Sequence, residues 1–193
     1  MNKKRENKSG LRLIKGNIHC EIFLGSVLIV AAPEDSRPFP VDAVAYEEDT
    51  FLVLSTDTRV RESEEHIVRL MTRVIEARPA ELGKVLVKGK RPFKLLAIVH
   101  DLDQNPTWKE EWIESALEGI FREAESRELR SVALPLIGTL HGSLKKRRFI
   151  ELLKMVLVRL KPCYLERLWL IAPVESNREI IELLKQANNS MQM

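Results

Sequence analysis

The chain has 193 residues, of which 45% are hydrophobic and 31% are charged. This length and balance predict one globular domain with a sizeable core. The net charge is +3, from 31 basic and 28 acidic residues, so no strong overall field draws in nucleic acid or a membrane surface.

Cysteine usage and hydropathy narrow the class of protein further. Cys20 and Cys163 lie far apart and outside any CxxC spacing, so the sequence predicts neither a disulfide framework nor a zinc site, and it favours a reducing cytoplasm. The longest apolar stretch, Ile22–Ala32, is about half of what spans a bilayer. Glutamine is scarce beside abundant Glu, Lys and Arg, which is typical of a heat-tolerant source.

The first part of the chain predicts strands after a basic tail at residues 1–9, which we expect to be solvated and disordered. Residues 11–32 predict two or three short strands separated by glycine-containing turns. A proline-rich surface loop follows at residues 32–40. Residues 41–55 predict two further strands, divided by an acidic turn at residues 47–49.

The second part alternates helices with strands. Apolar spacing over residues 62–77 predicts an amphipathic helix, which Pro79 ends. The remaining predicted elements are strands at 85–89 and 94–102, a helix starting at Pro106-Thr107, a strand at 131–137, a helix at about 144–160, a strand at 165–173 and a helix at 175–187. This alternation predicts an α/β layered domain over residues 10–187, with helices on both faces of the sheet and a short tail at 188–193.

One segment, Ser131–Leu144, joins a predicted strand to a helix through a loop of small and polar residues. Such a loop can present backbone N–H groups and a positive helix end to an anion, most often a phosphate. Alternatively, it is a strand-to-helix turn whose glycines serve geometry alone. The candidate ligand residues are Gly138, Thr139, His141, Gly142 and Ser143.

Other chemistries receive less support. Residues 100–103, His-Asp-Leu-Asp, follow an apolar strand and contain the Asp-x-Asp of Mg²⁺-dependent phosphotransferases, but the second acidic pair of those enzymes is missing. We therefore expect these residues to cap and solvate the segment before Trp108. The four histidines have no metal-ligand spacing, and Ser143 lacks the G-x-S-x-G elbow of a hydrolase, so the sequence predicts no metal site and no nucleophilic triad.

The basic run Lys145–Arg148 lies at the start of its predicted helix, where positive charge opposes the helix dipole. A phosphate-bearing partner would relieve that cost, so nucleic acid is one candidate partner. A solvated face is the favoured alternative, because no aromatic residues interleave with the run to stack on bases.

Five segments in order resemble the macro domain, a three-layer α/β/α module with a mixed central sheet that binds ADP-ribose and related nucleotides. The match covers residues 11–186. The segments are LRLIKGNI (11–18), VDAVAYEEDT (41–50), LLAIVHDL (95–102), SVALPLIGTLHGSL (131–144) and LERLWLIAPVESNREIIELLKQ (165–186). The fourth is similar to the family's second phosphate loop. Extra residues between 18 and 41 predict an added hairpin.

The chain departs from the family pattern at several positions. The acid that holds the adenine amino group becomes Asn17. The two asparagines of the family's N-A-A-N motif fall on Tyr46 and Asp49, and residues 51–60, where a glycine-rich phosphate loop belongs, contain no glycine. In the second loop, Leu140 replaces a glycine, and we expect it to fill space beside a pyrophosphate.

The resemblance implies a divergent macro-like domain that binds a phosphorylated ligand, such as a nucleotide or an ADP-ribose derivative, without catalysis and without a cofactor. The implied ligand residues are Asn17, Ile18, Asp49, Gly138, Thr139, His141, Gly142 and Ser143. The alternative is an RNA-associated or protein-interaction scaffold that kept the fold, with a cleft plugged by Leu140 and Tyr46. Neither a membrane partner nor an oligomeric state is implied.

Overall fold

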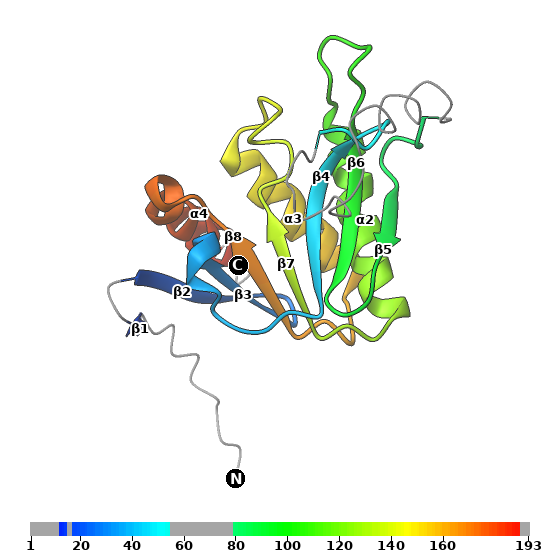
Figure 1. The fold of residues 1–193 in the computed structure, drawn as a ribbon. Coiled ribbons are helices and arrows are strands. Elements are labelled where there is room, and N and C mark those ends of the chain that lie inside the picture. The colour runs from blue at the N-terminus through cyan, green and yellow to red at the C-terminus, as the bar shows by residue number, and fades with distance from the viewer. Residues whose placement is uncertain (1–11, 15–16, 55–78, 190–193) are drawn as a thin grey trace.

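The computed structural model describes residues 12–14, 17–54 and 79–189, which build an eight-stranded mixed sheet with three α-helices packed against it (Figure 1). The strands are β1 (Arg12–Ile14), β2 (Asn17–Leu24), β3 (Val27–Ala32), β4 (Ala43–Asp49), β5 (Val85–Lys88), β6 (Phe93–His100), β7 (Ser131–Pro135) and β8 (Arg167–Ile171). The helices are α2 (Glu110–Ser126), α3 (Lys146–Leu160) and α4 (Asn177–Asn189), with short 3-10 turns η1 (Glu34–Ser36) and η2 (Val174–Ser176).

The strand order is β1-β2-β3-β8-β7-β4-β6-β5. The five strands from β3 to β6 in this order run parallel, while β1, β2 and β5 join antiparallel at the two sides. The parallel strands are rich in fully buried aliphatic residues, as expected where both faces of a sheet are covered. Because their carboxyl ends share one edge, the loops that follow β4, β6, β7 and β8 meet there.

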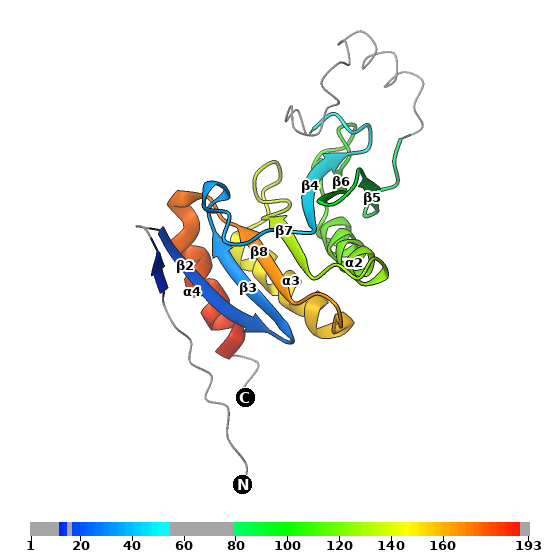
Figure 2. The same ribbon diagram turned by 60° about the horizontal axis from the view of Figure 1, so that its bottom comes forward.

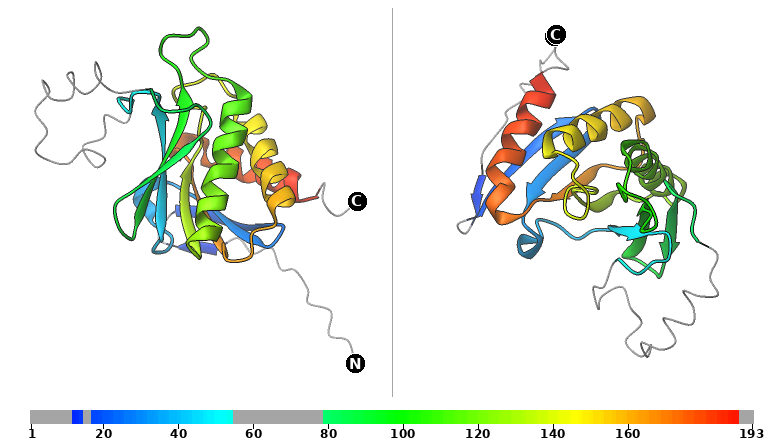
Figure 3. Two further views of the ribbon diagram at one scale, coloured as in Figure 1. Left: turned by 90° about the vertical axis from the view of Figure 1, so that its right-hand side faces the viewer. Right: turned by 90° about the horizontal axis from the view of Figure 1, so that it is seen from above.

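The helices α2, α3 and α4 lie side by side on the same face of the sheet (Figures 2 and 3). Each helix buries one apolar stripe, which in α3 includes Phe149, Leu153 and Leu157. These stripes and the facing strand residues make the main core. The mixed α/β sheet predicted from the sequence is thereby confirmed. The predicted helix at residues 62–77 lies outside the described residues.

A second, smaller core lies on the opposite face of the sheet, where the loop between β3 and β4 crosses it. Phe39 and Val41 of this loop pack on a cluster around Trp169, whose indole Nε1–H donates to the Ala32 carbonyl at 3.0 Å. The guanidinium of Arg167 lies 4.8 Å from the centre of the Phe39 ring. The predicted proline-rich loop is therefore more than a connection, because it covers apolar sheet residues.

Two local predictions are wrong. The acidic residues expected to form a turn at 47–49 instead continue β4 to Asp49, and residues 51–54 form a turn rather than a strand. The helix expected from Pro106 begins at Glu110, because residues 100–108 first fold back on themselves. Asp101 donates its N–H to the Thr107 carbonyl at 2.7 Å, and a β-bridge joins His100 to Trp108.

The other predicted strands and helices within the described residues are present, with ends shifted by a few residues. The predicted turn after β2 is made by Gly25, whose φ of 64° favours glycine. The tail at residues 1–9 lies outside the described residues, and α4 ends at Asn189. The domain boundaries stay a prediction.

Candidate functional site

The candidate site lies at the carboxyl edge of the parallel strands, where three connecting segments converge. They follow β4 at residues 50–54, β6 at 101–109 and β7 at 136–145. In Figure 1 the loops after β6 and β7 project beyond the same end of the sheet. Strand β4 pairs with both β6 and β7, so its last residues lie between the other two segments. The fold therefore brings Asp49 and the loop from Gly138 to Ser143 to one edge of the sheet.

The Asp49 carboxylate is buried and accepts hydrogen bonds from the backbone that follows it. Its Oδ1 accepts from the Phe51 N–H at 2.6 Å, and its Oδ2 accepts from the N–H groups of Val53 and Leu54 at 2.9 and 2.5 Å. Three backbone donors of the segment after β4 are thus already satisfied by a carboxylate of the same chain. In this arrangement Asp49 holds the segment rather than facing solvent.

A second carboxylate, that of Glu47, links β4 to both neighbouring strands. Its Oε1 lies 2.5 Å from Nε2 of His100, at the end of β6, and its Oε2 accepts from the Gly138 N–H at 3.0 Å. Both side chains are almost fully buried, with 8% of Glu47 and 1% of His100 exposed. The other ring nitrogen of His100, Nδ1, is 3.4 Å from Oγ1 of Thr107. Every polar atom of this pair therefore has a partner.

Sequence reasoning missed the Glu47–His100 pair. The prediction treated Glu47 as part of a turn and His100 as part of a capping segment. One signal was present in the sequence, because a glutamate and a histidine each end an apolar strand. Since the carboxyl ends of parallel strands share an edge, such residues can meet.

The glycines of the loop after β7 are explained by packing. Gly138 has a φ of 79°, and a Cβ there would collide with Ile113 of α2. A Cβ on Gly142 would lie 2.5 Å from the Gly138 carbonyl oxygen and 3.0 Å from the Trp108 ring. The Thr139 hydroxyl donates to the Leu136 carbonyl at 2.8 Å. These contacts favour the geometric interpretation of both glycines and of Thr139.

The tip of the same loop, residues 140–143, differs from Gly138 and Thr139 in its hydrogen bonding. In the part of the chain that the structure describes, no hydrogen bond engages the backbone N–H groups of Leu140, His141, Gly142 and Ser143. His141 is exposed, and its ring stands edge-to-face with that of His100, with 6.3 Å between the centroids. The N-terminus of α3 follows directly. A run of donors at this place can hold an anion.

Leu140 does not plug this edge. Leu140 is 79% exposed, so the prediction that its side chain fills the space beside a phosphate is wrong. Tyr46 is half-buried within β4.

Asn17 and Ile18 lie at the same edge of the sheet but on a more distant strand. They begin β2, which runs antiparallel to β3 and so starts where β3 ends. Two strands, β3 and β8, separate them from the β7 loop. Their role as ligand residues stays a prediction.

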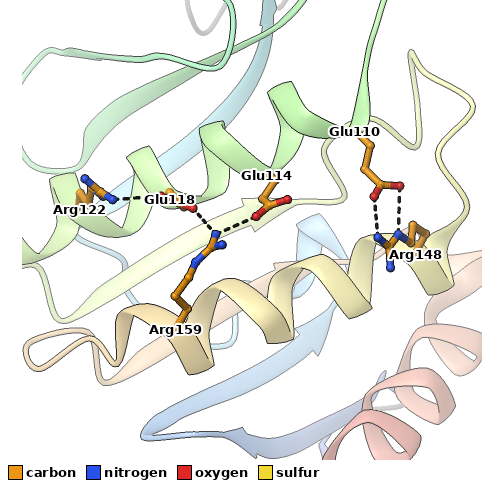
Figure 4. Close-up of polar contacts among 6 residues, drawn as sticks. All are labelled: Glu110, Glu114, Glu118, Arg122, Arg148 and Arg159. Atoms are coloured by element: carbon orange, nitrogen blue, oxygen red, sulfur yellow. Dashed lines mark hydrogen bonds and ion pairs between the residues drawn. The ribbon is translucent and has the colours of Figure 1, made fainter.

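The basic run at the start of α3 is largely neutralised by acids. Lys146 bonds Glu179 at 2.8 Å, and Arg147 bonds Glu151 at 3.3 Å. Arg148 donates two hydrogen bonds to Glu110 of α2, from Nη2 to Oε1 at 2.6 Å and from Nε to Oε2 at 3.0 Å (Figure 4). The Arg148 guanidinium holds the pKa of the Glu110 carboxyl below its usual range. Three of the four basic side chains are therefore internally paired.

Two surface hollows lie away from this edge. A groove of about 570 Å³ runs between α3 and α4, lined by apolar residues such as Met155, Val158 and Leu183. Another of about 420 Å³ lies between residues 81–85 and α2. Within the described ranges, no three His, Cys, Asp or Glu side chains gather as a metal ion would require. Of the helices in those ranges, none is long and apolar enough for a bilayer crossing.

The sequence matches no protein-family model and no curated protein. Solved structures, in contrast, resemble the chain over most of its length. The Oceanobacillus iheyensis macrodomain with ADP is 13% identical, with a TM-score of 0.67, and the match covers 89% of this chain and 97% of that one. A mutant of the same macrodomain, solved with ADPR, is 11% identical with a TM-score of 0.65, over 87% of this chain and 97% of that one.

Two further structures agree. The macro domain of ganglioside induced differentiation associated protein 2 is 10% identical, with a TM-score of 0.58, over 83% of this chain and 85% of that one. The macrodomain of Thermus aquaticus DarG is 15% identical, with a TM-score of 0.55, over 75% of this chain and 98% of that one. At such identities the likeness concerns the fold.

Proposed function

We propose that this chain, which has a divergent macrodomain fold, binds a phosphorylated ligand of the nucleotide or ADP-ribose class at the carboxyl edge of its sheet. The observation that carries the proposal is the run of backbone N–H groups from Leu140 to Ser143, which have no acceptor among the described atoms. Exposed His141 lies within the run, and the N-terminus of a 15-residue helix follows it. Phosphate oxygens are the acceptors that such a place favours.

Two structures of similar fold add support, since the Oceanobacillus iheyensis macrodomain was solved with ADP and its mutant with ADPR. We propose binding without turnover, because Tyr46 and Asp49 stand where the resembled family has asparagines. The Asp49 carboxylate is also committed to its own backbone. A cytoplasmic location and a heat-tolerant source belong to the proposal as well, on cysteine usage and on the excess of Glu, Lys and Arg.

One observation favours a second function, a protein-interaction scaffold that kept the fold without its ligand. The carboxylates of Asp49 and Glu47 accept from backbone N–H groups that an anion could otherwise use. A scaffold of this kind would bind no phosphate compound at this edge. A titration of the chain with phosphate compounds therefore separates the two functions.

Calorimetry with ADP-ribose, ADP and AMP tests the proposal, with Ser143 variants to locate the site. Ser143→Pro removes one N–H group, and the preceding Gly142 tolerates the restriction that proline imposes. We expect Ser143→Pro to weaken binding about tenfold, the effect of one lost hydrogen bond to a charged group. Ser143→Ala keeps the N–H group and should weaken binding less. Absence of both heat and a thermal shift with all three compounds would sink the proposal in favour of the scaffold.

A further inference from the structure

A row of three side chains crosses β2, β3 and β8 on the sheet face that points away from the helices. Phe23 of β2 pairs with Leu28 of β3, and Leu28 pairs with Arg167 of β8. Directly opposed residues of neighbouring strands point to the same face, so these side chains lie beside one another. This face also carries Trp169, two residues beyond Arg167 on β8. The three described helices pack on the other face (Figures 2 and 3), and Phe23 is 51% exposed.

Arg167, at one end of this row, carries a positive charge that no acid among the described residues neutralises. Its guanidinium lies 4.8 Å from the centre of the Phe39 ring. Its Nε is buried without a hydrogen-bond acceptor, and the ion pairs between described residues do not include it. A buried N–H group of a cation without an acceptor destabilises the isolated chain. Arg167 therefore has binding capacity that a second molecule can use.

The other end of the row presents groups that bind a guanidinium. Glu21 lies two residues from Phe23 on β2, so an exposed carboxylate and an exposed aromatic ring point to the same face. A guanidinium forms charge-assisted hydrogen bonds with a carboxylate and stacks on an aromatic ring. Within one chain, however, β3 lies between β2 and β8, so two strand spacings of about 5 Å each separate these groups from Arg167.

We infer that this face binds the same face of a second copy of the chain, in a two-fold contact centred on β3. A two-fold axis parallel to β3 places β2 of each copy over β8 of the other, because β2 and β8 flank β3. Each Arg167 then lies between Phe39 of its own chain and the Phe23 ring and Glu21 carboxylate of the other copy. The contact is remote from the carboxyl-edge loops, so it does not depend on the proposed ligand.

Sedimentation velocity of the full chain over a range of concentrations tests the inference. We expect dimers at about 100 µM protein, as for a small and reversible contact. Phe23→Ser should weaken dimerisation about tenfold or more, because aromatic residues at the centre of a contact contribute most of its binding energy. The matched control is Leu86→Ser, at a 38% exposed residue of β5 on the far side of the sheet, which should dimerise like the unmodified chain.

Two charge reversals locate the contact. Arg167→Glu and Glu21→Arg each bring like charges together twice when the variant pairs with itself, so each variant alone should be monomeric at that concentration. An equimolar mixture of the two variants restores both opposite-charge pairs, and we expect it to dimerise. Simple misfolding of either variant would not give this recovery.

Three outcomes would overturn the inference. The first is an unmodified chain that stays monomeric up to about 1 mM, where even a contact of 4 kcal/mol, a rough lower bound, is half-formed. The second is a mixture of the two charge variants that stays monomeric although circular dichroism shows both to be folded. Where a charge variant does not fold, equal dimerisation of Phe23→Ser and Leu86→Ser is the third.

Discussion

Glu47 is the residue on which the carboxyl edge of the sheet depends most directly. It contacts a histidine 53 positions away and a glycine 91 positions away, so it ties β4 to β6 and to the loop after β7. Both of its partners, Nε2 of His100 and the N–H of Gly138, belong to buried residues. A buried donor without an acceptor destabilises the fold, because it has lost its hydration and gained no hydrogen bond in return.

We therefore expect Glu47→Ala to lower the free energy of unfolding by about 2–3 kcal/mol, because Nε2 of His100 and the Gly138 N–H both lose their acceptor. Urea denaturation measures the change. Glu166→Ala is the matched control, since it removes an exposed glutamate paired to Arg130 at 3.5 Å, and its effect should stay within about 0.5 kcal/mol. Equal effects of the two substitutions would contradict the structural role of Glu47.

At the scale of the elements, α2 and α3 are joined by an apolar seam with charged pairs along its solvent side (Figure 4). Arg159 bonds Glu114 at 2.9 Å and also bonds Glu118, while Arg148 bonds Glu110 and Glu151. Exposed pairs are individually weak, at about 0–1 kcal/mol each. The apolar seam therefore supplies most of the free energy that holds α2 against α3. The ion pairs make the remaining part of that free energy depend on pH.

The direction of that sensitivity follows from the pKa values. Arg148 is the main cause that lowers the pKa of both Glu110 and Glu151. Groups with a lowered pKa stabilise the fold at pH values above the ordinary carboxyl value, and that stabilisation is lost as the pH falls through the lowered pKa. The window of loss therefore lies below about pH 4.5, the ordinary value for glutamate.

We expect Arg148→Met, which keeps the apolar stem, to be less stable than the unmodified chain at pH 7 by about 1 kcal/mol. The difference should shrink at pH 3, because protonated Glu110 and Glu151 no longer gain from the arginine. Urea unfolding at both pH values tests this. Arg130→Met, at a longer and more exposed pair, should show a smaller difference. A difference that is the same at pH 7 and pH 3 would rule out the ionic explanation.

At the scale of the whole molecule, the charge distribution argues against tight binding of nucleic acid. The net charge is only +3, and three of the four basic side chains at the start of α3 are paired with acids. Phosphate contacts would have to compete with those pairs. The residues at 1–9 carry further basic charge, so their contribution must be measured separately.

We expect the chain to elute from a heparin column below about 0.15 M salt, because the net charge is only +3 and three of the four basic side chains at the start of α3 are paired with acids. A variant lacking residues 1–9 is the control, and it should elute slightly earlier. Retention at higher salt with a steep salt dependence would instead support the RNA-associated alternative. If that retention disappears with the tail, the contact belongs to the tail rather than to α3.

Most elements of the fold were predictable because they depend on patterns within a few residues. The apolar strands β6 and β7 and the amphipathic helices α2 and α3 show their period directly in the sequence. The loop after β7 was also recognisable, since its glycines and hydroxyl residues directly follow a strand. The misplaced start of α2 reflects residues 100–108, whose return contacts leave no periodic signal.

The sequence by itself determined the α/β class, the order of most elements and the position of one candidate anion loop. Only the tertiary structure decided which backbone N–H groups of that loop keep no acceptor among the described residues. Hydrogen-bond partners such as Glu47 and Gly138 depend on strand order and register, which bring together residues far apart along the chain. A carboxylate satisfies the first buried donor it reaches, and local sequence does not specify which donor the folded sheet will place there.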